Sequence, residues 1–271
     1  MKIAVTGFPG GLVRDKLVSL GVEPLDVDIL DEDTLNGTIQ TVLPDVVIHA
    51  ASMTDVDACE LDYKKAFQTN VRGTMYVAEA CNRVNARMVY LSTCHVFDGA
   101  KNIKESYLET SRTNPKNVYG FTKWTGEVIT HSTADKFLIV RISKLIHSEQ
   151  FKKYLYTKDA IELPNFMWRN YTHIDIFSEL LLQVITKPFY GNKFILNLGS
   201  ADSIDSHLLI SGVFAKLWLD TRLVRYRDYE LPNLVFRPHN GSLDMRLAIN
   251  SGIDLPYVSH SIDLVAKELQ I

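Results

Sequence analysis

The chain of 271 residues is long enough to bury a core as one large domain or as two closely joined ones. Its 46% hydrophobic and 23% charged residues are typical of a globular protein, and a net charge of −3 argues against nucleic acid or an acidic membrane as a partner. The three cysteines do not have the spacing of metal ligands and are too few for a disulfide framework, so we expect neither. No apolar run is long enough for a membrane span, and the start of the sequence does not have the pattern of a secretion signal. We therefore expect a cytoplasmic protein that acts on a small molecule.

The first half of the chain alternates short apolar runs with helical patterns. Strands are expected at 2–5, 45–50, 87–92 and 137–143, and a weaker one, shortened by Pro24, at 22–29. Helices are expected at about 11–20, 31–42, 63–85 and 116–132. This alternation predicts an α/β fold with a doubly wound parallel sheet of the Rossmann-like type.

The regular alternation of expected strands and helices ends at about residue 145. Helices are expected at 171–185, 206–219 and 259–270, and strands at 193–199 and 222–226. No linker or repeat separates the halves, so we divide the chain into a nucleotide-binding domain at 1–145 and a small C-terminal α/β portion at 146–271. Some elements of the second portion are expected to return to the first.

The glycine loop "TGFPGGLV" at 6–13 follows the first expected strand. In a dinucleotide fingerprint the first two glycines serve the turn and the pyrophosphate, and the third serves helix packing. Gly7 and Gly10 keep the first two positions, and Val13 alters the third. A plain strand-to-helix turn is the alternative, because a lone fingerprint is a weak signal.

An acidic residue about 20 positions downstream holds a ribose hydroxyl in such folds. Asp26 and Asp28 lie 19 and 21 residues after Gly7, although "DVDILDEDT" also suits a solvated turn that caps the next helix. Arg14 is a candidate for a 2′-phosphate instead. These residues leave NAD and NADP undistinguished.

Two segments contain candidate catalytic side chains. In "NVYGFTKWTGE" (117–127), Tyr119 and Lys123 are four apart and share a helix face, where an ammonium favours the phenolate of the tyrosine. In "YLSTCHVFDG" (90–99), Ser92 and Thr93 end a buried strand, which is where parallel sheets bind ligands. Taken singly, the first pair is compatible with a surface coincidence and the second with a turn cap.

Together these motifs resemble the extended short-chain dehydrogenase/reductase family. The resemblance rests on "TGFPGG", "HAASMTDVDACE", "NVRGT", "YLSTCHVFDG" and "NVYGFTKWTGE", in that order. Within the family the chain is most similar to the dTDP-4-dehydrorhamnose reductase group, which also has counterparts of "RNYTHIDIFSELL" (169–181) and "RPHNGSLD" (237–244). The resemblance covers most of the chain.

The resemblance implies roles for individual residues. The catalytic residues are Thr93, Tyr119 and Lys123, of which Tyr119 exchanges the proton and Lys123 also holds the nicotinamide ribose. The residues that line NADP or NAD, besides Tyr119 and Lys123, are Gly7, Phe8, Pro9, Gly10, Gly11, Leu12, Asp28, Ile29, Ala50, Ala51, Ser52 and Ser92. The residues beside the substrate are Thr54, Val56, Asp57, Cys94, His95, Lys144 and Arg237. Asn70 opens a segment that packs near the active site.

The residues next to Arg237 in the sequence also indicate a binding role for this arginine. Pro238 fixes the chain next to it, and Ser242 is expected to cap a helix that begins at Leu243. A guanidinium on such a turn can bind diphosphate oxygens in a bidentate manner. A structural arginine that pairs with a local acid is the alternative.

Four departures from the family pattern affect mainly the substrate. Val13 replaces a packing glycine, Cys94 and His95 together replace a carboxylate and a phenol, and Lys144 replaces an aromatic ring. The stretch between about 145 and 165 is short for the family, which would shrink the substrate cap. A Cys94–His95 nucleophile is disfavoured because adjacent residues at a strand end point in opposite directions. Lys144 either accepts a phosphate or reaches solvent.

The sequence therefore predicts an oxidoreductase of dTDP-rhamnose biosynthesis type. We expect it to reduce a nucleotide-linked 4-keto-6-deoxy sugar, with hydride from nicotinamide and a proton from Tyr119. A nucleotide-sugar epimerase or dehydratase of the same family is one alternative. A non-catalytic NAD(P)-binding regulatory subunit, similar to the β subunit of methionine adenosyltransferase, is another. The expected partners are the nucleotide sugar and a second copy of the chain in a homodimer.

Overall fold

The structure, a computed structural model, describes residues 1–157, 159–163, 167–187, 192–226 and 235–270. Its centre is a six-stranded sheet with the order β10-β5-β4-β3-β1-β2, in which every neighbouring pair is parallel. The strands are β1 (Ile3–Thr6), β2 (Glu23–Leu25), β3 (Val46–His49), β4 (Arg87–Thr93), β5 (Phe137–Ile142) and β10 (Lys193–Asn197). The strand order reverses between β1 and β3, and at such a point the loops after the strands diverge and leave room for a ligand.

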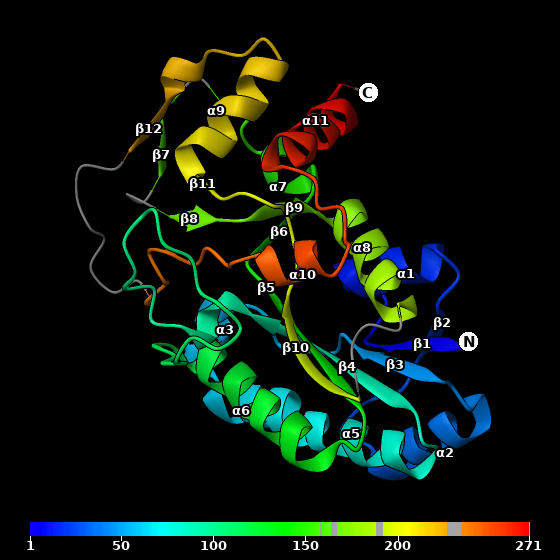
Figure 1. The fold of residues 1–271 in the computed structure, drawn as a ribbon. Helices are drawn as coiled ribbons and strands as arrows, with labels where there is room; N and C mark the ends of the chain where they lie inside the picture. Colours follow the sequence, from blue (N-terminus) through cyan, green and yellow to red (C-terminus); the bar gives the residue numbers. More distant parts are fainter. Residues whose placement is uncertain (158, 164–166, 188–191, 227–234, 271) are drawn as a thin grey trace.

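Helices cover both faces of the sheet (Figure 1). One layer contains α2 (Glu32–Val42), α5 (Gly73–Arg83) and α6 (Val118–Thr133). The other contains α1 (Leu12–Ser19), α8 (Ile174–Thr186) and α10 (Arg246–Asn250).

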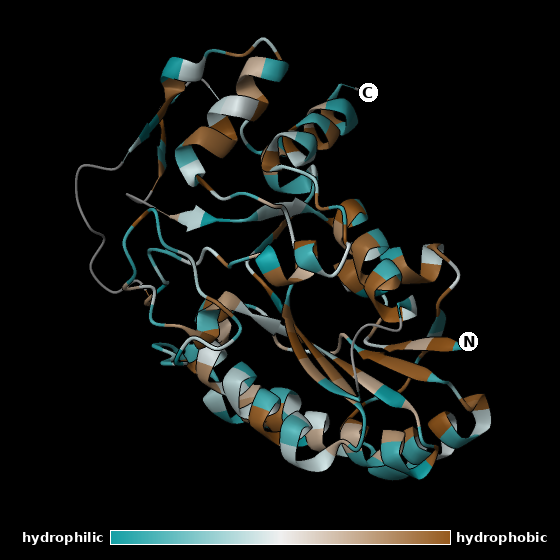
Figure 2. Cartoon of the chain, viewed as in Figure 1, coloured by the Kyte–Doolittle hydropathy of each residue, from teal (hydrophilic) through white to brown (hydrophobic). Residues whose placement is uncertain are grey.

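Alternating side chains of the strands fill two separate cores. In β4, Val89 and Leu91 pack into the core beneath α1 and α8, whereas Met88 and Tyr90 pack into the core beneath α2 and α5. This two-residue period is the expected property of a strand with both faces buried. Figure 2 shows mostly hydrophobic colour on the sheet and hydrophilic residues on the outer helix faces.

A third core lies in the second half of the chain, away from the central sheet. It is enclosed mainly by α7 (Glu149–Lys152), α9 (Ser206–Lys216) and α11 (Val258–Leu269). Three strand pairs accompany these helices. The pairs are β6 (Lys144–Ile146) with β9 (Tyr171–His173), β7 (Ile161–Leu163) with β12 (Val224–Tyr226), and β8 (Trp168–Arg169) with β11 (Ile204–Asp205).

The expected elements of the first half are present, with one irregularity. The single helix expected at 63–85 consists of α4 (Tyr63–Phe67), a π-helical turn η1 (Gln68–Arg72) and α5. A short helix α3 (Val56–Leu61) precedes it and was not expected. The π turn places Asn70 inward, where its side chain makes four hydrogen bonds.

Two expectations for the second half are wrong in detail. The helix expected at 171–185 begins only at Ile174, because residues 171–173 pair with β6 as strand β9. Ser242 caps no helix at Leu243. Helix α10 begins at Arg246, and the carboxylate of Asp244 accepts the hydrogen bond from its backbone N–H.

The short 3₁₀ turns are η2 (Cys94–Val96) and η3 (Thr221–Leu223), the latter occupying part of the strand expected at 222–226. From the second half of the chain, β10 joins the central sheet beside β5, and α8 packs on α1. Each helix in the described part of the chain is too short or too polar to cross a lipid bilayer.

Candidate active site

The glycine loop joins β1 to α1 with the backbone that its sequence predicts. Gly7 has φ +128 and Gly10 has φ +92, values that side chains other than glycine rarely adopt. No side chain caps the start of α1, so the first amides of this helix remain available to an anion. An anionic oxygen already sits at the loop, since Asp15 Oδ2 accepts from Gly10 N at 2.7 Å.

Arg14 lies against this loop but its charge is already neutralised. Its side-chain carbons would lie 3.6 Å from a Cβ on Gly7, and its guanidinium pairs with Asp15 and with Asp26. The structure therefore brings Asp26 to the glycine loop through Arg14. The carboxylate of Asp28 instead accepts from the backbone of Leu30 at 2.9 Å. The side chain of Ile29 is buried in the core against Gly73.

The segment after β3 connects the glycine loop to α6. Ala51 N donates to Thr6 Oγ1 at 3.2 Å, directly before Gly7. Ser52 Oγ donates to the side chain of Asn70 at 3.0 Å, and Asn70 Nδ2 donates to Thr122 Oγ1 at 3.0 Å. Thr122 lies between Tyr119 and Lys123 on α6, so three predicted site segments are joined by hydrogen bonds.

The structure brings Thr93, Tyr119 and Lys123 together. Thr93 is the last residue of β4, and its hydroxyl lies close enough to the phenol of Tyr119 on α6 to affect the pKa of that phenol. Asn117 positions the start of this helix by accepting from Gly120 N at 2.6 Å. Close approach requires Gly120, because a Cβ there would lie 2.2 Å from the carbonyl oxygen of His95.

The electrostatics of this group differ from the expectation. Burial raises the pKa of Tyr119 above its ordinary value, and the neighbouring hydroxyl of Thr93 only partly opposes this rise. Burial also lowers the pKa of Lys123 to about 7, and its Nζ lies 4.1 Å from the centre of the Tyr90 ring. The expected lowering of the Tyr119 pKa by Lys123 is therefore absent in the protein alone, because desolvation penalises both charged forms.

Ser92 was expected to line the cofactor, but its hydroxyl is committed elsewhere. Ser92 Oγ donates to Glu127 Oε1 at 2.5 Å, and Arg141 holds the same carboxylate. Only the backbone of Ser92 is therefore available for the predicted contact with the cofactor. Glu127 was not among the predicted site residues, although it follows Lys123 by four residues on the same helix face.

Cys94 and His95 have separate partners, which gives a Cys–His nucleophile no support. Cys94 is buried, and its Sγ donates to the backbone oxygen of Ser143 at 3.4 Å. His95 Nδ1 accepts from Asn117 Nδ2 at 3.0 Å, and its ring lies edge-on to Tyr119 with centroids 5.4 Å apart. Burial and the cations of Arg169, Lys144 and Arg237 lower the pKa of His95 to about 3. The imidazole is therefore neutral, with its proton on Nε2.

The remaining predicted substrate residues lie on different elements. Thr54 is exposed before α3, and Val56 is the first residue of this helix. Asp57, one residue later, forms an ion pair with Arg237. Lys144 is exposed at the start of β6, next to the ends of β4 and β5.

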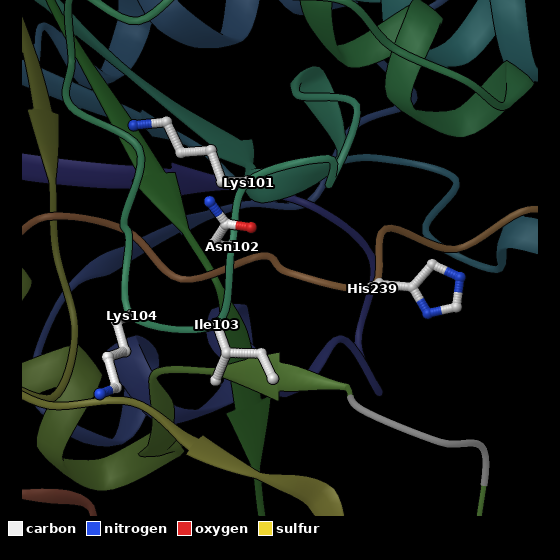
Figure 3. A pocket seen from close by; sticks show the side chains of 5 residues that line it. All are labelled: Lys101, Asn102, Ile103, Lys104 and His239. Atoms are coloured by element: carbon white, nitrogen blue, oxygen red, sulfur yellow. The ribbon is translucent and has the colours of Figure 1, made fainter.

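A cavity of about 560 Å³ that the sequence did not indicate lies between the loop after η2 and the segment 235–241. Figure 3 shows the side chains that line it, which are Lys101, Asn102, Ile103, Lys104 and His239. Asn240 holds the two segments together by donating to the backbone oxygens of Asn102 and Glu105 at 2.8 Å.

One group in the described part of the chain has the composition of a metal site, namely His173, Asp175 and Glu268. However, His173 Nδ1 accepts from the backbone N–H of Asp175, and Nε2 of the same ring lies 3.3 Å from Glu268 Oε1. Lys16 pairs with Asp175 at 2.8 Å. These contacts link helices α1, α8 and α11, and we interpret the group as structural rather than as a set of metal ligands.

Comparison with known proteins adds a family match over nearly the whole chain. Residues 6–270 match the model of the family described as RmlD substrate binding domain. A dTDP-4-dehydrorhamnose reductase of Aggregatibacter actinomycetemcomitans is 39% identical over 151 residues, which are 52% of this chain and 51% of that protein. The chain thus spans about half the length of the first curated relatives that it matches. The spore coat polysaccharide biosynthesis protein SpsK of Bacillus subtilis is 25% identical over 93% of this chain and 92% of its own.

Solved structures are similar over the full length. A dTDP-4-dehydrorhamnose reductase from Clostridium acetobutylicum has a TM-score of 0.88 and 26% identity, and all of both chains is covered. The enzyme of the same name from Bacillus anthracis, in complex with NADP, has a TM-score of 0.87 and 22% identity over 99% of this chain and all of its own. The predicted α/β fold with a Rossmann-like sheet is confirmed.

Proposed function

The chain belongs to the RmlD substrate binding domain family, and from this membership we propose that it is an NAD(P)-dependent reductase of a nucleotide-linked 4-keto-6-deoxy sugar. The relatives named dTDP-4-dehydrorhamnose reductase support this choice of substrate class. The first of these relatives is matched over about half of its length.

The observation that carries the proposal is the grouping of Thr93, at the end of β4, with Tyr119 and Lys123 on α6. Hydrogen bonds through Asn70 connect α6, which carries Tyr119 and Lys123, with the segment that bonds to Thr6 before the glycine loop, and this connection supports the proposal. A phenol for proton transfer and a loop for a dinucleotide are the two parts that such a reductase needs.

The residues of the loop fit a dinucleotide. A Cβ on Gly10 would point into open space, which is where a ligand can approach the backbone, and the uncapped start of α1 offers amides to a pyrophosphate. We propose that residues Gly7 to Leu12 hold the pyrophosphate, Asp26 or Asp28 the adenine ribose, and Ala50 to Ser52 the middle of the cofactor. When bound, NADH or NADPH would supply the hydride.

The chain's own residues would handle the proton and the orientation of the sugar. Thr93 would hold the carbonyl oxygen, and Tyr119 would deliver its phenolic proton to that oxygen. Lys123, as an ammonium, would stabilise the phenolate that remains. The neutral ring of His95, with its proton on Nε2, offers a donor to a sugar hydroxyl, and Arg237 offers a bidentate contact to the diphosphate.

The test is oxidation of NADH or NADPH by the purified protein in the presence of dTDP-4-keto-6-deoxy sugar, followed by absorbance at the nicotinamide band. Stoichiometric oxidation supports a reductase. Conversion of a nucleotide sugar without net oxidation would indicate the epimerase or dehydratase alternative instead. Tight dinucleotide binding with no turnover of any nucleotide sugar would indicate the binding subunit.

We also propose a cytoplasmic location and a homodimer, both of which rest on the sequence and on the family. Sedimentation velocity of the purified chain tests the second, and a monomer at micromolar concentration would contradict it. The division at residue 145 remains a prediction that expression of the two parts would test.

A further inference from the structure

His95 follows strand β4 and lies beside two of the predicted catalytic residues. Its backbone N–H donates to Thr93 Oγ1 at 3.3 Å, and its ring lies edge-on to that of Tyr119, with centroids 5.4 Å apart. The start of α6 approaches the backbone of His95 so closely that a Cβ on Gly120 would lie 2.2 Å from its carbonyl oxygen. The position of the imidazole next to the phenol is therefore fixed from two sides.

The side chain of Asn117 contacts this imidazole, and two backbone groups determine its own orientation. Asn117 is 6% exposed. Its Oδ1 accepts from the backbone N–H of Gly120 at 2.6 Å, and its Nδ2 donates to the backbone oxygen of Phe236 at 2.8 Å. Because a backbone N–H can only donate and a backbone oxygen can only accept, the carboxamide cannot be turned over without the loss of both bonds.

This orientation determines which nitrogen of His95 carries the proton. Asn117 Nδ2 lies 3.0 Å from His95 Nδ1, and because an amide nitrogen only donates, Nδ1 must accept. Burial first, and then three neighbouring cations, lower the pKa of His95 to about 3, so the ring is neutral near pH 7. The cations are Arg169, Lys144 and Arg237. A neutral ring that accepts at Nδ1 has its proton on Nε2.

The Nε2–H group of His95 is available to a ligand. The residue is partly exposed, and no group in the described part of the chain is hydrogen-bonded to Nε2. Because the ring lies beside Tyr119, this donor is next to the phenol that would deliver a proton to the substrate. The reacting carbon C4 of a 4-keto-6-deoxy sugar has one neighbour that bears a hydroxyl, which is C3. A donor next to the phenol is suitably placed for the oxygen next to the reacting carbonyl.

We propose that His95 determines substrate specificity by donating from Nε2 to the C3 hydroxyl of the 4-keto sugar, and that Asn117 is the positioning residue that fixes this donor. Asn117 touches neither substrate nor cofactor in this scheme and acts through His95. The contact with the sugar rests on the proposed reductase activity, whereas the tautomer of His95 is a property of the protein alone.

The first test determines the tautomer without substrate. Two-bond couplings between the ring nitrogens and the carbon-bound ring protons are recorded by NMR on ¹⁵N-labelled protein, and the His95 signals are identified by their loss in His95→Phe. In wild type, Nδ1 should be unprotonated. In Asn117→Asp the capping oxygen remains but a carboxylate oxygen replaces the donor, so Nδ1 should become protonated. A protonated Nδ1 in wild type, or an unprotonated Nδ1 in Asn117→Asp, would overturn the proposal.

Asn82→Asp is the matched control for this substitution. Asn82 also accepts from a backbone N–H, that of Asp135 at 2.9 Å, and donates to a backbone oxygen, that of Thr133 at 2.8 Å. It joins α5 to the C-terminal end of α6, whereas Asn117 caps the N-terminal end. Nδ1 of His95 should remain unprotonated in Asn82→Asp. A protonated Nδ1 in this control would show that the contact with Asn117 is not what sets the tautomer.

The second test compares the nucleotide-linked 4-keto-6-deoxy sugar with its 3-deoxy analogue as substrates. In wild type, kcat/KM for the analogue should be about 3- to 10-fold lower, the range for one neutral hydrogen bond. His95→Phe keeps an aromatic ring but removes the donor, so the two substrates should become equal. If His95→Phe still prefers the parent sugar to the same extent, the role of His95 is wrong.

A double-mutant cycle tests whether Asn117 acts through His95. Asn117→Ser keeps a helix-capping oxygen and adds no charge. It should weaken the preference for the parent sugar when His95 is present and change nothing in His95→Phe. An undiminished preference in Asn117→Ser, or an equal effect in both backgrounds, would overturn the role of Asn117.

The two tests separate this inference from the proposed function. An unprotonated Nδ1 in a protein that turns over no 4-keto sugar would contradict the reductase proposal and leave the tautomer as inferred. Turnover that depends on Tyr119, with equal kcat/KM for the parent sugar and its 3-deoxy analogue in wild type, would contradict only the role of His95.

Discussion

Arg237 and Asp57, which are 180 positions apart in the chain, form an ion pair with 2.6 Å between Nη2 and Oδ2. The contact joins the segment after residue 235 to helix α3. A second nitrogen of Arg237, Nη1, donates to the backbone oxygen of Val235 at 2.9 Å. The acid that partners Arg237 is thus remote in sequence rather than local, and the arginine side chain remains 31% exposed.

Arg237→Lys should raise the KM for the nucleotide sugar while the affinity for the dinucleotide stays the same. A lysine ammonium can keep the pair with Asp57 but cannot bind a diphosphate in a bidentate manner. Because the pair is partly exposed, the free energy of unfolding should change by only about 0–1 kcal/mol. Steady-state kinetics and thermal unfolding measure these quantities. Equal loss of both affinities together with a lower Tm would favour a purely structural arginine.

Gly10→Asp should abolish dinucleotide binding, because it places a second carboxylate where the pyrophosphate would lie. The control is Gly21→Asp, since Gly21 has a similar φ of +89 and its Cβ also meets no atom within 4 Å. Both variants carry the same backbone strain, but Gly21 lies at the far end of α1. Titration calorimetry with NADH and NADPH compares them. Normal binding by Gly10→Asp would show that the cofactor does not use this loop.

Tyr119→Phe should lower kcat by about 100- to 10,000-fold, the range for loss of a general acid. The ring remains, so dinucleotide affinity should change little. Tyr171→Phe is a matched control, because Tyr171 is also buried and donates to a backbone oxygen, that of Met167, at 3.1 Å. Its kcat should equal that of wild type. If Tyr119→Phe turns over as fast as wild type, Tyr119 is not the proton donor.

The stability of the protein should rise with pH above about 7 through Lys123. The pKa of Lys123 is lowered to about 7 in the folded state from 10.5, so between these values the unfolded chain binds more protons. The free energy of unfolding therefore increases in this window, by at most about 1.4 kcal/mol per pH unit. Lys123→Met lacks this increase, whereas Lys267→Met, on an exposed position of α11, should retain it. Urea unfolding from pH 6.5 to 9.5 measures the difference, and parallel curves for wild type and Lys123→Met would contradict it.

Wild-type protein should bind NADH more tightly than NADPH. Arg14 is already paired with Asp15 and Asp26, so a 2′-phosphate would meet the partly exposed carboxylate of Asp26. Asp26→Asn removes this repulsion and frees the guanidinium, so the affinity for NADPH should increase relative to that for NADH. Fluorescence titration of both cofactors measures the ratio. Tighter binding of NADPH by wild type would contradict this reading of the pair.

Much of the fold is predictable from short segments. The apolar runs at 2–5, 45–50, 87–92 and 137–143 all lie in the central sheet, because a strand buried on both faces must be apolar throughout. The π turn within the helix expected at 63–85 was not predictable, since "QTNVR" has the same apolar spacing as an unbroken helix. The strand at 171–173 was also missed, because its pairing with β6 depends on residues 27 positions away.

The sequence by itself determined the parts of the site that depend on neighbours along the chain. The positive φ at Gly7 and Gly10 follows from glycine, and the shared face of Tyr119 and Lys123 follows from helical periodicity. Only the tertiary structure decided which groups meet across the chain and which charges they carry. The pairs Arg237–Asp57, Arg14–Asp26 and Glu127–Arg141 depend on which elements pack together, and the lowered pKa of Lys123 depends on burial. Spacing along a chain specifies direction and proximity over a few residues, whereas desolvation and ion pairing arise only when distant segments exclude water from one another.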